Sequence, residues 1–235
     1  TVDSLTTTSH TCAVLDTGVL KCWGYNNYGQ LGLGSKLQQS TPQTVNLGPG
    51  KTATSVSAGI YHTCAALIDG TMKCWGRGNY GQLGLGSYDD ELIPKLVNLG
   101  STVNVTNVYA GYEYTCAIQN YESLYCWGYN NYGQLGDGST TNRNMPIEIP
   151  FANDKKASYL SLGKSGGTIS CAVLDDKSLS CWGYNLNNEI DGDTNVDQHR
   201  PITIGSKIGR KMNSIEVGNT HTCAILDDGS LKCWG

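Results

Sequence analysis

Short apolar runs separated by glycine-rich turns recur along the chain, and each run predicts a short β-strand. In one stretch four such runs follow one another, at residues 94–99, 105–110, 115–118 and 124–127. Pro94 opens the first run, a position where a missing backbone N–H is tolerated. Four short strands per unit of about 50 residues predict a β-propeller blade. A single blade leaves both of its faces uncovered, so we expect neighbouring blades to stack around shared cores.

The same unit repeats along the whole chain. Its marker is a pair of cysteines at fixed spacing, the second followed by Trp-Gly. The five pairs are Cys12 and Cys22, Cys64 and Cys74, Cys116 and Cys126, Cys171 and Cys181, and Cys223 and Cys233. The first cysteine recurs after 52, 52, 55 and 52 residues, and we place the three extra residues in a longer surface loop around 151–154. In the fourth repeat Asn188-Glu189-Ile190-Asp191 replaces Gly-Gln-Leu-Gly. We predict one all-β array over 1–235, with four full blades and the opening hairpin of a fifth.

Charge and hydropathy exclude several classes of protein. The net charge is −4, whereas binding to nucleic acid or to an anionic membrane surface needs clustered Lys and Arg. No apolar run approaches the ~18 residues of a membrane-spanning helix. We therefore expect no nucleic-acid partner and no membrane insertion. The chain opens and stops within a repeat, so we expect it to be part of a longer protein.

Each cysteine pair lies on a predicted hairpin. If Asp16-Thr17-Gly18 is a three-residue turn with Gly18 at positive φ, counting outward places Cys22 opposite Cys12. Opposed Cα atoms in a non-hydrogen-bonded antiparallel pair lie about 4.5 Å apart, which a disulfide can bridge. Glu122 and Lys177 replace this glycine in the third and fourth repeats, where the turns can differ. We predict five disulfides, and hence an oxidising environment outside the cell or at the cell surface.

Two other states of the cysteines stay open at this stage. The ten thiols could be reduced and buried as small apolar groups. A zinc site could use His62, Cys64 and Cys74, but a structural zinc needs four ligands, and the histidine becomes Tyr114 in the third repeat.

The tryptophans and histidines that recur in the repeat are predicted to serve packing. Strand alternation places the Trp after each second cysteine on the face opposite the sulfur atoms, where it can pack against a neighbouring blade. His10, His62 and His221 recur at one position, which favours a structural role over catalysis. Matches to nucleotide-binding glycine motifs fall inside the propeller repeat, and no nucleophile elbow is present. We expect no catalytic site and no cofactor.

Two further candidate sites remain. Asp191, Asp193, Asn195 and Asp197 alternate in the degenerate fourth repeat, and alternating oxygen ligands can bind Ca²⁺ in a loop. That pattern lacks the glycine and the distal glutamate of a standard calcium loop, so a solvated acidic loop is the alternative. Asn104-Val105-Thr106 is the one N-glycosylation sequon, and it lies between two predicted strands.

The repeat resembles a known family. Residues 62–84 contain HTCAAL, then Asp69-Gly70, then CWG and NYGQLG, with near copies at 11–32 and 115–136. This pattern resembles the regulator of chromosome condensation repeat over essentially the whole chain. The resemblance implies a seven-bladed propeller, which needs about 360 residues at this repeat length. Members of the wider family include a nucleotide exchange factor for a nuclear small GTPase and secreted binding proteins.

Three functions follow from these patterns. The first is an extracellular protein-binding or adhesion module, with variable loops on a rigid propeller. The second is a structural subunit of an extracellular filament, appendage or matrix that self-associates through open ends of the array. The third is guanine nucleotide exchange on a small GTPase. Of the three, this function agrees least with the paired cysteines and the negative net charge.

Overall fold

The computed structural model describes residues 1–100, 104–120, 123–164, 166, 168–186, 188–190, 195–204 and 209–235. Within them the chain folds into four four-stranded antiparallel sheets and one three-stranded sheet, each with its strands in sequence order. Blade 1 contains β1 (Val2–Thr7), β2 (His10–Leu15), β3 (Leu20–Gly24) and β4 (Gln39–Thr44). Blade 2 contains β5 (Ala53–Ala58), β6 (His62–Leu67), β7 (Met72–Gly76) and β8 (Glu91–Leu96). Blade 3 contains β9 (Val105–Ala110), β10 (Tyr114–Gln119), β11 (Ser123–Gly128) and β12 (Arg143–Ile149).

The last two blades differ in completeness. Blade 4 contains β13 (Ala157–Leu162), β14 (Ile169–Leu174), β15 (Leu179–Gly183) and β16 (Gln198–Thr203). Blade 5 contains β17 (Met212–Val217), β18 (Thr222–Leu226) and β19 (Leu231–Trp234). None of the helical segments in the described residues is long and apolar enough to cross a bilayer. The predicted all-β blade architecture is confirmed.

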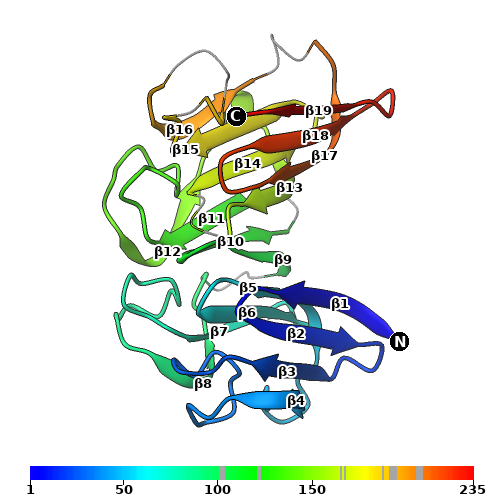
Figure 1. The fold of residues 1–235 in the computed structure, drawn as a ribbon, viewed down its shortest axis with the longest axis vertical. Helices are drawn as coiled ribbons and strands as arrows, with labels where there is room; N and C mark the ends of the chain where they lie inside the picture. Colours follow the sequence, from blue (N-terminus) through cyan, green and yellow to red (C-terminus); the bar gives the residue numbers. More distant parts are fainter. Residues whose placement is uncertain are drawn as a thin grey trace.

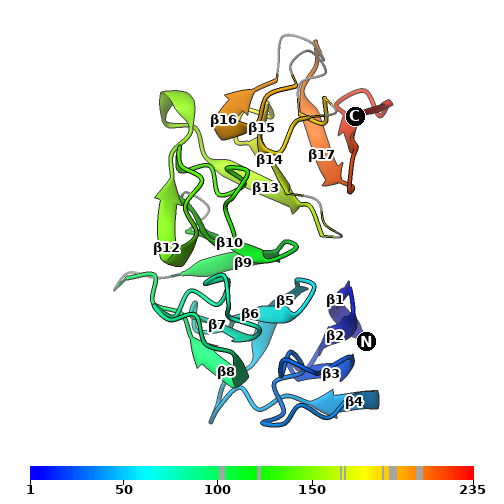
Figure 2. The same cartoon turned by 60° about the vertical axis from the view of Figure 1, so that its left-hand side comes forward.

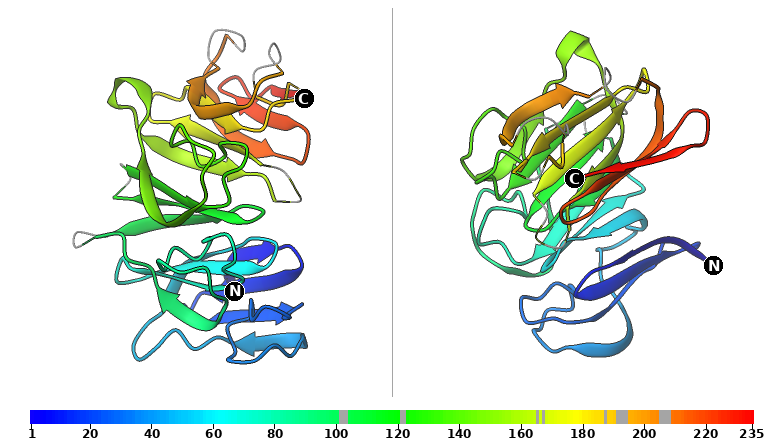
Figure 3. Two further views of the ribbon diagram at one scale, coloured as in Figure 1. Left: turned by 90° about the vertical axis from the view of Figure 1, so that its left-hand side faces the viewer. Right: turned by 45° about the horizontal axis from the view of Figure 1, so that its top comes forward.

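The blades follow one another in sequence order around an arc (Figures 1 and 2). Each blade's first strand contacts the first strand of the next blade, from β1 and β5 through to β13 and β17. The fourth strands β4, β8, β12 and β16 pair on one side only and form the outer edge of each blade. In the left view of Figure 3 the two chain termini lie in the terminal blades, at opposite ends of the arc.

The predicted hairpin register is confirmed. Cys12 pairs with Cys22 across β2 and β3, and Gly18 in the connecting turn has φ 74°. Lys177 adopts the same left-handed conformation, with φ 64°, in the turn of blade 4. The hairpin therefore tolerates a side chain where glycine is favoured, and the cysteine pairing is unchanged.

The predicted strand at 94–99 was placed three residues too late. The strand β8 begins at Glu91, so Pro94 lies inside the strand rather than at its start. The pairing between β7 and β8 is irregular between Cys74 and Gly76, and β8 is an edge strand. A proline is tolerated at a bulged edge because its missing N–H interrupts no central ladder.

The three extra residues of the long period do not lie around 151–154, as predicted, but in the segment between β13 and β14. Seven residues separate the paired Leu162 and Ser170 there, against four between the paired Ala110 and Thr115 in blade 3. The loop between β12 and β13 has seven residues, no more than the eight between β8 and β9. Both segments join strands at the blade surface, where an insertion is tolerated, so the repeat spacing alone does not distinguish them.

Ala152–Asp154 forms a single 3₁₀ turn, η1, between β12 and β13. Its residues are exposed, but the preceding Phe151 ring packs edge-on against Trp182 with ring centroids 5.9 Å apart. The loop between β12 and β13 is thus anchored to the core by one aromatic side chain.

Tryptophan side chains join each blade to the one before it, as predicted. The indole N–H of three of them donates to a main-chain carbonyl of the preceding blade at 2.9 Å. The pairs are Trp75 with Gln30, Trp127 with Gln82, and Trp182 with Gln134. The indoles also cover glycines of the preceding repeat, because a Cβ on Gly32 would lie 2.8 Å from the Trp75 Nε1. All three indoles are fully buried, so this contact is part of each interblade core.

Hydrogen bonds next to the tryptophans complete the interblade contact. His10 Nε2 lies 2.6 Å from Thr63 Oγ1, and Thr63 Oγ1 also donates to the Gln30 carbonyl at 2.8 Å. His62 Nε2 makes the equivalent contact to Thr115 Oγ1 at 2.9 Å. Burial lowers the pKa of His10 to about 4 and that of His62 to about 3. Both histidines are therefore neutral packing groups at neutral pH.

Candidate protein-interaction face

One side of the blades carries a continuous row of aromatic side chains. The first residue of β2 pairs with the last residue of β3, so the first turn and the third-to-fourth-strand loop of a blade share one side. We call this side the aromatic face. Its row, named here the tyrosine row, consists of Tyr25, Tyr28, Tyr61, Arg77, Tyr80, Tyr129, Tyr132 and Tyr184.

The row begins at the junction of blades 1 and 2. Tyr25 and Tyr28 follow β3, and Tyr61 lies in the turn between β5 and β6. The Tyr61 ring centroid lies 5.8 Å from that of Tyr25 and 4.9 Å from that of Tyr28. The rings are tilted by 45° and 48°, an arrangement favoured by their quadrupoles. The contact therefore links two blades through side chains at the surface.

The row continues across blades 3 and 4. The Tyr80 and Tyr129 rings meet edge-on with centroids 5.0 Å apart. Tyr132 lies 6.3 Å from Tyr129 and 5.2 Å from Tyr184 of blade 4. These rings are partly exposed, and 36% of Tyr132 is accessible to solvent. The row is thus a contiguous aromatic surface over four blades.

Arg77 connects the two halves of the row. Its guanidinium carbon lies 4.9 Å from the centroid of Tyr28, 5.6 Å from that of Tyr61 and 5.9 Å from that of Tyr80. Arg77 Nη1 also donates to Glu113 Oε1 of blade 3 at 2.7 Å. Burial raises the pKa of Glu113, and the Arg77 charge opposes that rise. The cation is held by rings on one side and by a buried carboxylate on the other.

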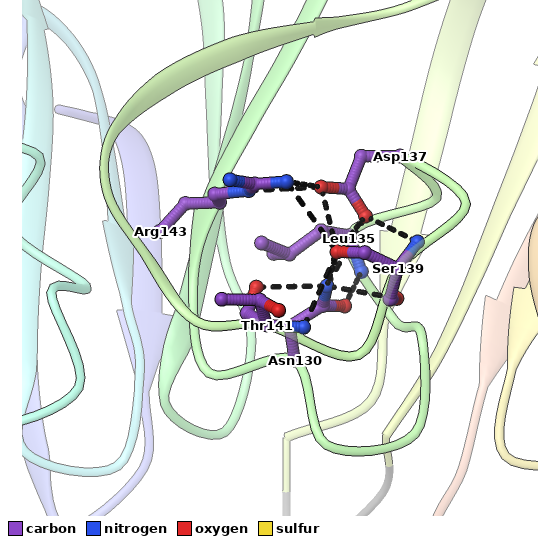
Figure 4. Close-up of polar contacts among 6 residues, drawn as sticks. All are labelled: Asn130, Leu135, Asp137, Ser139, Thr141 and Arg143. Atoms are coloured by element: carbon purple, nitrogen blue, oxygen red, sulfur yellow. Dashed lines mark hydrogen bonds and ion pairs between the residues drawn. The ribbon is translucent and has the colours of Figure 1, made fainter.

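The loop between β11 and β12, to which Tyr129 and Tyr132 belong, is held together by polar contacts around Asn130 (Figure 4). Asn130 is fully buried, and its Nδ2 donates to the carbonyls of Ser139 at 3.0 Å and Thr141 at 3.1 Å. Its Oδ1 accepts the N–H of Leu135 at 2.9 Å. One side chain therefore closes the loop that carries both rings.

Asp137 adds an ion pair to the same loop (Figure 4). Arg143 donates to Asp137 Oδ2 from Nε at 2.9 Å and from Nη2 at 2.6 Å. The Ser139 N–H and hydroxyl donate to Asp137 Oδ1 at 2.9 Å and 2.8 Å. Burial alone would raise the pKa of Asp137, but these hydrogen bonds outweigh it and leave the pKa below its usual value. The loop uses its charges internally, which leaves the tyrosines for other contacts.

Buried asparagines hold the equivalent loops of blades 1 and 4. Asn26 binds the Leu37 carbonyl and the Leu31 N–H, and Asn185 binds the Ile190 N–H. Gly78 takes this position in blade 2, where its N–H donates to Asp90 Oδ1 at 3.0 Å. The loop scaffold therefore persists across the four blades with one variation.

The predicted calcium cluster is only partly described. Asp191 and Asp193 lie outside the described residues. Asp197 Oδ1 accepts the Asn185 N–H at 2.9 Å, so this carboxylate supports the loop of blade 4, and Asn195 lies in the same loop. Among the described residues no group of three or more His, Cys, Asp or Glu side chains is placed to hold a metal ion. Calcium binding by this cluster stays a prediction.

The predicted glycosylation site lies away from the tyrosine row. Asn104 is exposed and directly precedes β9, and its carbonyl accepts the Asn120 N–H at the second-to-third-strand hairpin of blade 3. Those hairpins lie at the opposite end of the strands from the aromatic face. Glycosylation of Asn104 stays a prediction.

All ten cysteines are paired as predicted. The Cα–Cα distances are 4.1–4.2 Å, and no cysteine is free. The disulfides of blades 1 to 4 are completely buried. The disulfide Cys12–Cys22 shares a core with Trp75 of the next blade, so sulfur and indole lie on opposite faces of a blade. Five disulfides indicate an oxidising compartment.

Comparison with known proteins identifies the repeat. The model of the regulator of chromosome condensation (RCC1) repeat matches residues 18–66, 69–118 and 122–173. The chain belongs to the RCC1 repeat family. A second RCC1 repeat model matches residues 53–82, 105–134 and 213–235. The family suggested by the sequence pattern is thereby confirmed.

Relatives and structures of RCC1 type cover almost the whole chain. The ultraviolet-B receptor UVR8 of Arabidopsis thaliana is 31% identical over 227 residues, which are 97% of this chain and 51% of that protein. The crystal structure of human WBSCR16 matches with a TM-score of 0.86 at 18% identity, covering 100% of this chain and 62% of that one. Yeast RCC1 (Prp20), solved bound to Kap60, matches with a TM-score of 0.82 at 19% identity, covering 97% and 54%. This chain spans about half of the length of UVR8, and RCC1 propellers commonly bind proteins.

The tyrosine row is absent from the sequence-based predictions. Its signal is the segment Trp-Gly-Tyr-Asn-Asn-Tyr, which occurs after Cys22 and again after Cys126. Two tyrosines three residues apart next to a predicted strand end indicate repeated exposed aromatics. Their contact across blades, however, follows from the stacking of the blades and not from their spacing along the chain.

Proposed function

We propose that this chain is an extracellular protein-binding module and that the tyrosine row is its binding surface. It acts by binding, without catalysis and without a cofactor. The observation that carries the proposal is the unbroken series of contacts from Tyr25 to Tyr184 across four blades, in which rings contact rings except where Arg77 joins the two halves. Membership of the RCC1 family supports a protein partner.

The chemistry of the aromatic face supports a protein partner as well. Tyr and Arg are enriched among the residues that dominate binding energy at interfaces. Tyrosine offers a large contact area at a small cost in conformational entropy, and paratopes combine it with Asn, Gly and Ser. The tyrosine row has a similar composition, since Asn27, Asn79 and Asn131 are exposed between its tyrosines. Such a surface suits a folded or extended protein segment.

The disulfides support the extracellular part of the proposal. Disulfide bonds persist in secreted proteins and at cell surfaces, and they are rare where thiols are kept reduced. Each bridge in this chain closes a short local loop and is expected to contribute about 3 kcal/mol by restricting the unfolded chain. A role in a reducing nucleus would remove that stabilisation from every blade.

A binding screen with two matched variants tests the proposal. The purified, oxidised chain is screened against an array of extracellular domains, together with Tyr80→Ala/Tyr129→Ala in the row and Ile68→Ala on the opposite side. Ile68 is 68% exposed in the hairpin between β6 and β7 and serves as the control. We expect a partner whose affinity falls about a hundredfold in the row variant and is unchanged in the control.

Two outcomes contradict the proposal. Equal binding by the wild type and the row variant would move the binding surface elsewhere. Loss of binding in Ile68→Ala alone would assign it to the hairpin side. Thermal unfolding of all three proteins shows whether a loss of binding reflects a loss of folding.

A structural role is the second candidate function. Leu5 on the outward side of β1 is 64% exposed, and Ile225 and Leu231 on blade 5 are 45% and 66% exposed. Apolar residues on the terminal sheets favour association between copies. Electron microscopy of native material would support this role if it showed filaments, and separate single particles would oppose it.

A further inference from the structure

Arg77 is the one member of the tyrosine row that is not a tyrosine. The residue after Trp-Gly is Tyr25 in blade 1, Tyr129 in blade 3 and Tyr184 in blade 4, but Arg77 in blade 2. A tyrosine at this position would continue the row without any charge. The arginine therefore gives the centre of the row a chemistry that the rings lack.

Most of the hydrogen-bonding capacity of Arg77 is unused. A guanidinium carries five N–H donors. In the described part of the chain Arg77 makes one ion pair, from Nη1 to Glu113 Oε1 at 2.7 Å. Nε and Nη2, which form the other edge of the fork, donate to no described protein group. This edge is available for a bidentate acceptor.

The remaining donors are held in place before any partner arrives. Three tyrosine rings surround the guanidinium, the nearest at 4.9 Å. The Arg77 side chain is 25% exposed and that of Glu113 only 8%, so solvent reaches the pair mainly through the arginine. A fixed guanidinium loses little conformational entropy when it binds an acceptor. The pair is thus built to present a cation at the surface while its counter-ion stays below.

We propose that Arg77 binds a side-chain carboxylate of the partner, so that the segment seated on the tyrosine row carries an Asp or Glu flanked by apolar residues. This inference rests on the proposed function of the row as a protein-binding surface. The planar fork matches a carboxylate through two parallel hydrogen bonds. The surrounding rings fit the apolar flanks.

A carboxylate fits this site better than a phosphate. Proteins that bind phosphorylated segments use clusters of arginines. The row contains one arginine, and Glu113 already neutralises part of its charge. A singly charged acceptor is therefore the matching ligand. Glu113 also weakens the binding of that acceptor by like-charge repulsion. A substitution of Glu113 therefore provides a second test of the proposal.

Selection from a displayed library of random dodecapeptides, with blocked C-termini, tests the inference. Peptides are selected on the wild type and compared on Arg77→Tyr, which restores the tyrosine of the other repeats, and on Arg77→Lys. Binding peptides are then resynthesised as amides with their acidic residue replaced by Asn or Gln. We expect an acidic residue at a fixed position, with an affinity about tenfold lower after its replacement in the peptide.

The variants of the protein distinguish the effect of the positive charge from that of the two-donor geometry of the guanidinium. Arg77→Tyr should bind the acidic and the neutral peptide equally, and Arg77→Lys should recover only part of the preference because it lacks the fork. Glu113→Gln should bind the acidic peptide more tightly than the wild type does. The inference is wrong if the selected peptides carry no acidic residue, or if replacing that residue weakens binding equally in Arg77→Tyr.

The same experiment distinguishes this inference from the proposed function. Peptides that need Tyr80 and Tyr129 but not Arg77 would leave the row as a binding surface and overturn the carboxylate site. A library from which no peptide binds through the row would count against both.

Discussion

The two sides of the blades use their polar groups in opposite ways. On the hairpin side, turns are tied to neighbouring segments by exposed ion pairs, such as Lys51 with Asp69, Lys155 with Asp176, and Arg210 with Asp227. On the aromatic side, loop side chains such as Asn130 and Asp137 make their hydrogen bonds within the loop, and tyrosines remain at the surface. The hairpin side therefore presents a solvated charged surface, and the aromatic side presents rings on an internally satisfied scaffold.

This difference indicates which side is suited to bind. Exposed ion pairs are worth little and are screened by salt, so they do not demand a partner. Covering partly exposed aromatic rings with a partner is favourable, because it removes apolar surface from water. The following predictions test the contrast, from the largest expected effect to the smallest.

Asn130→Ala should destabilise the protein by about 4 kcal/mol. The substitution leaves the buried N–H of Leu135 and the carbonyls of Ser139 and Thr141 without their partner, and each such group is costly. Denaturant unfolding measures the effect. Asn131→Ala, next to it but exposed, is the control and should change stability by less than about 0.5 kcal/mol. Similar effects of the two changes would mean that the loop scaffold is not what holds the row.

Acidification should first reduce the stability contributed by the buried histidines at the aromatic end of the strands. The pKa of His10 is lowered to about 4 and that of His62 to about 3, so the unfolded chain binds more protons below its usual histidine pKa of 6.5. Burial of each neutral histidine therefore stabilises the folded state fully above pH 6.5. This stabilisation is lost as the pH falls from 6.5 to the folded-state pKa, and the loss is about 3 kcal/mol for one histidine. Unfolding free energies at pH 7, 5.5 and 4 measure this loss.

A substitution isolates the contribution of one histidine. His62→Tyr should reduce the loss between pH 6.5 and 4, because Tyr114 occupies the same position in blade 3 and does not titrate there. A glycine lies against the ring at this position in both blades, Gly59 at His62 and Gly111 at Tyr114. An unchanged pH profile would show that His62 does not contribute to the acid sensitivity.

The Lys51–Asp69 ion pair on the hairpin side should persist to lower pH than the histidine contribution. Hydrogen bonds from Lys51 and Thr71 lower the pKa of Asp69 to about 2. This contribution is present above the usual carboxyl pKa and is lost only as the pH falls toward 2. Because Asp69 is largely exposed, the effect on stability is small. Carboxyl chemical shifts recorded by NMR during an acid titration should show Asp69 protonating well below pH 4, and protonation near the ordinary value would remove the pair.

Lys155→Ala should have the smallest effect, less than about 1 kcal/mol. Its Nζ lies 2.8 Å from Asp176 Oδ2 at a solvent-exposed hairpin, and such pairs contribute little. Denaturant unfolding in low and high salt checks the value and its screening. A cost close to that of Asn130→Ala would erase the contrast between the two sides.

The sequence predicts those features that depend on local geometry. The count outward from Gly18 places Cys12 against Cys22, because a hairpin register depends only on its turn. Strand alternation likewise places the tryptophans opposite the sulfur atoms. Pro94 was misplaced because an edge strand tolerates a proline in its interior, which local rules place at the start.

Features that depend on blade stacking escape such local rules. The fourth repeat loses Gly-Gln-Leu-Gly, yet Thr222 still donates to the Glu189 carbonyl and Trp234 to the Ile190 carbonyl. These acceptors are main-chain groups, which any residue supplies, so the side-chain sequence can change while the interface persists. The tyrosine row is hidden for a related reason, since Tyr61 and Tyr28 come from different blades and meet only in three dimensions.

Photocrosslinking from the two sides in the protein's native setting tests the central claim most directly. A photoreactive benzophenone residue replaces Asn131 in one variant and Asp228 in the other, both at exposed positions, one beside the tyrosine row and one on a hairpin. We predict a specific crosslinked protein from position 131 that disappears when Tyr80 and Tyr129 are also changed to alanine, and none from position 228. A specific crosslink from position 228 alone would contradict the assignment of the aromatic face as the binding surface.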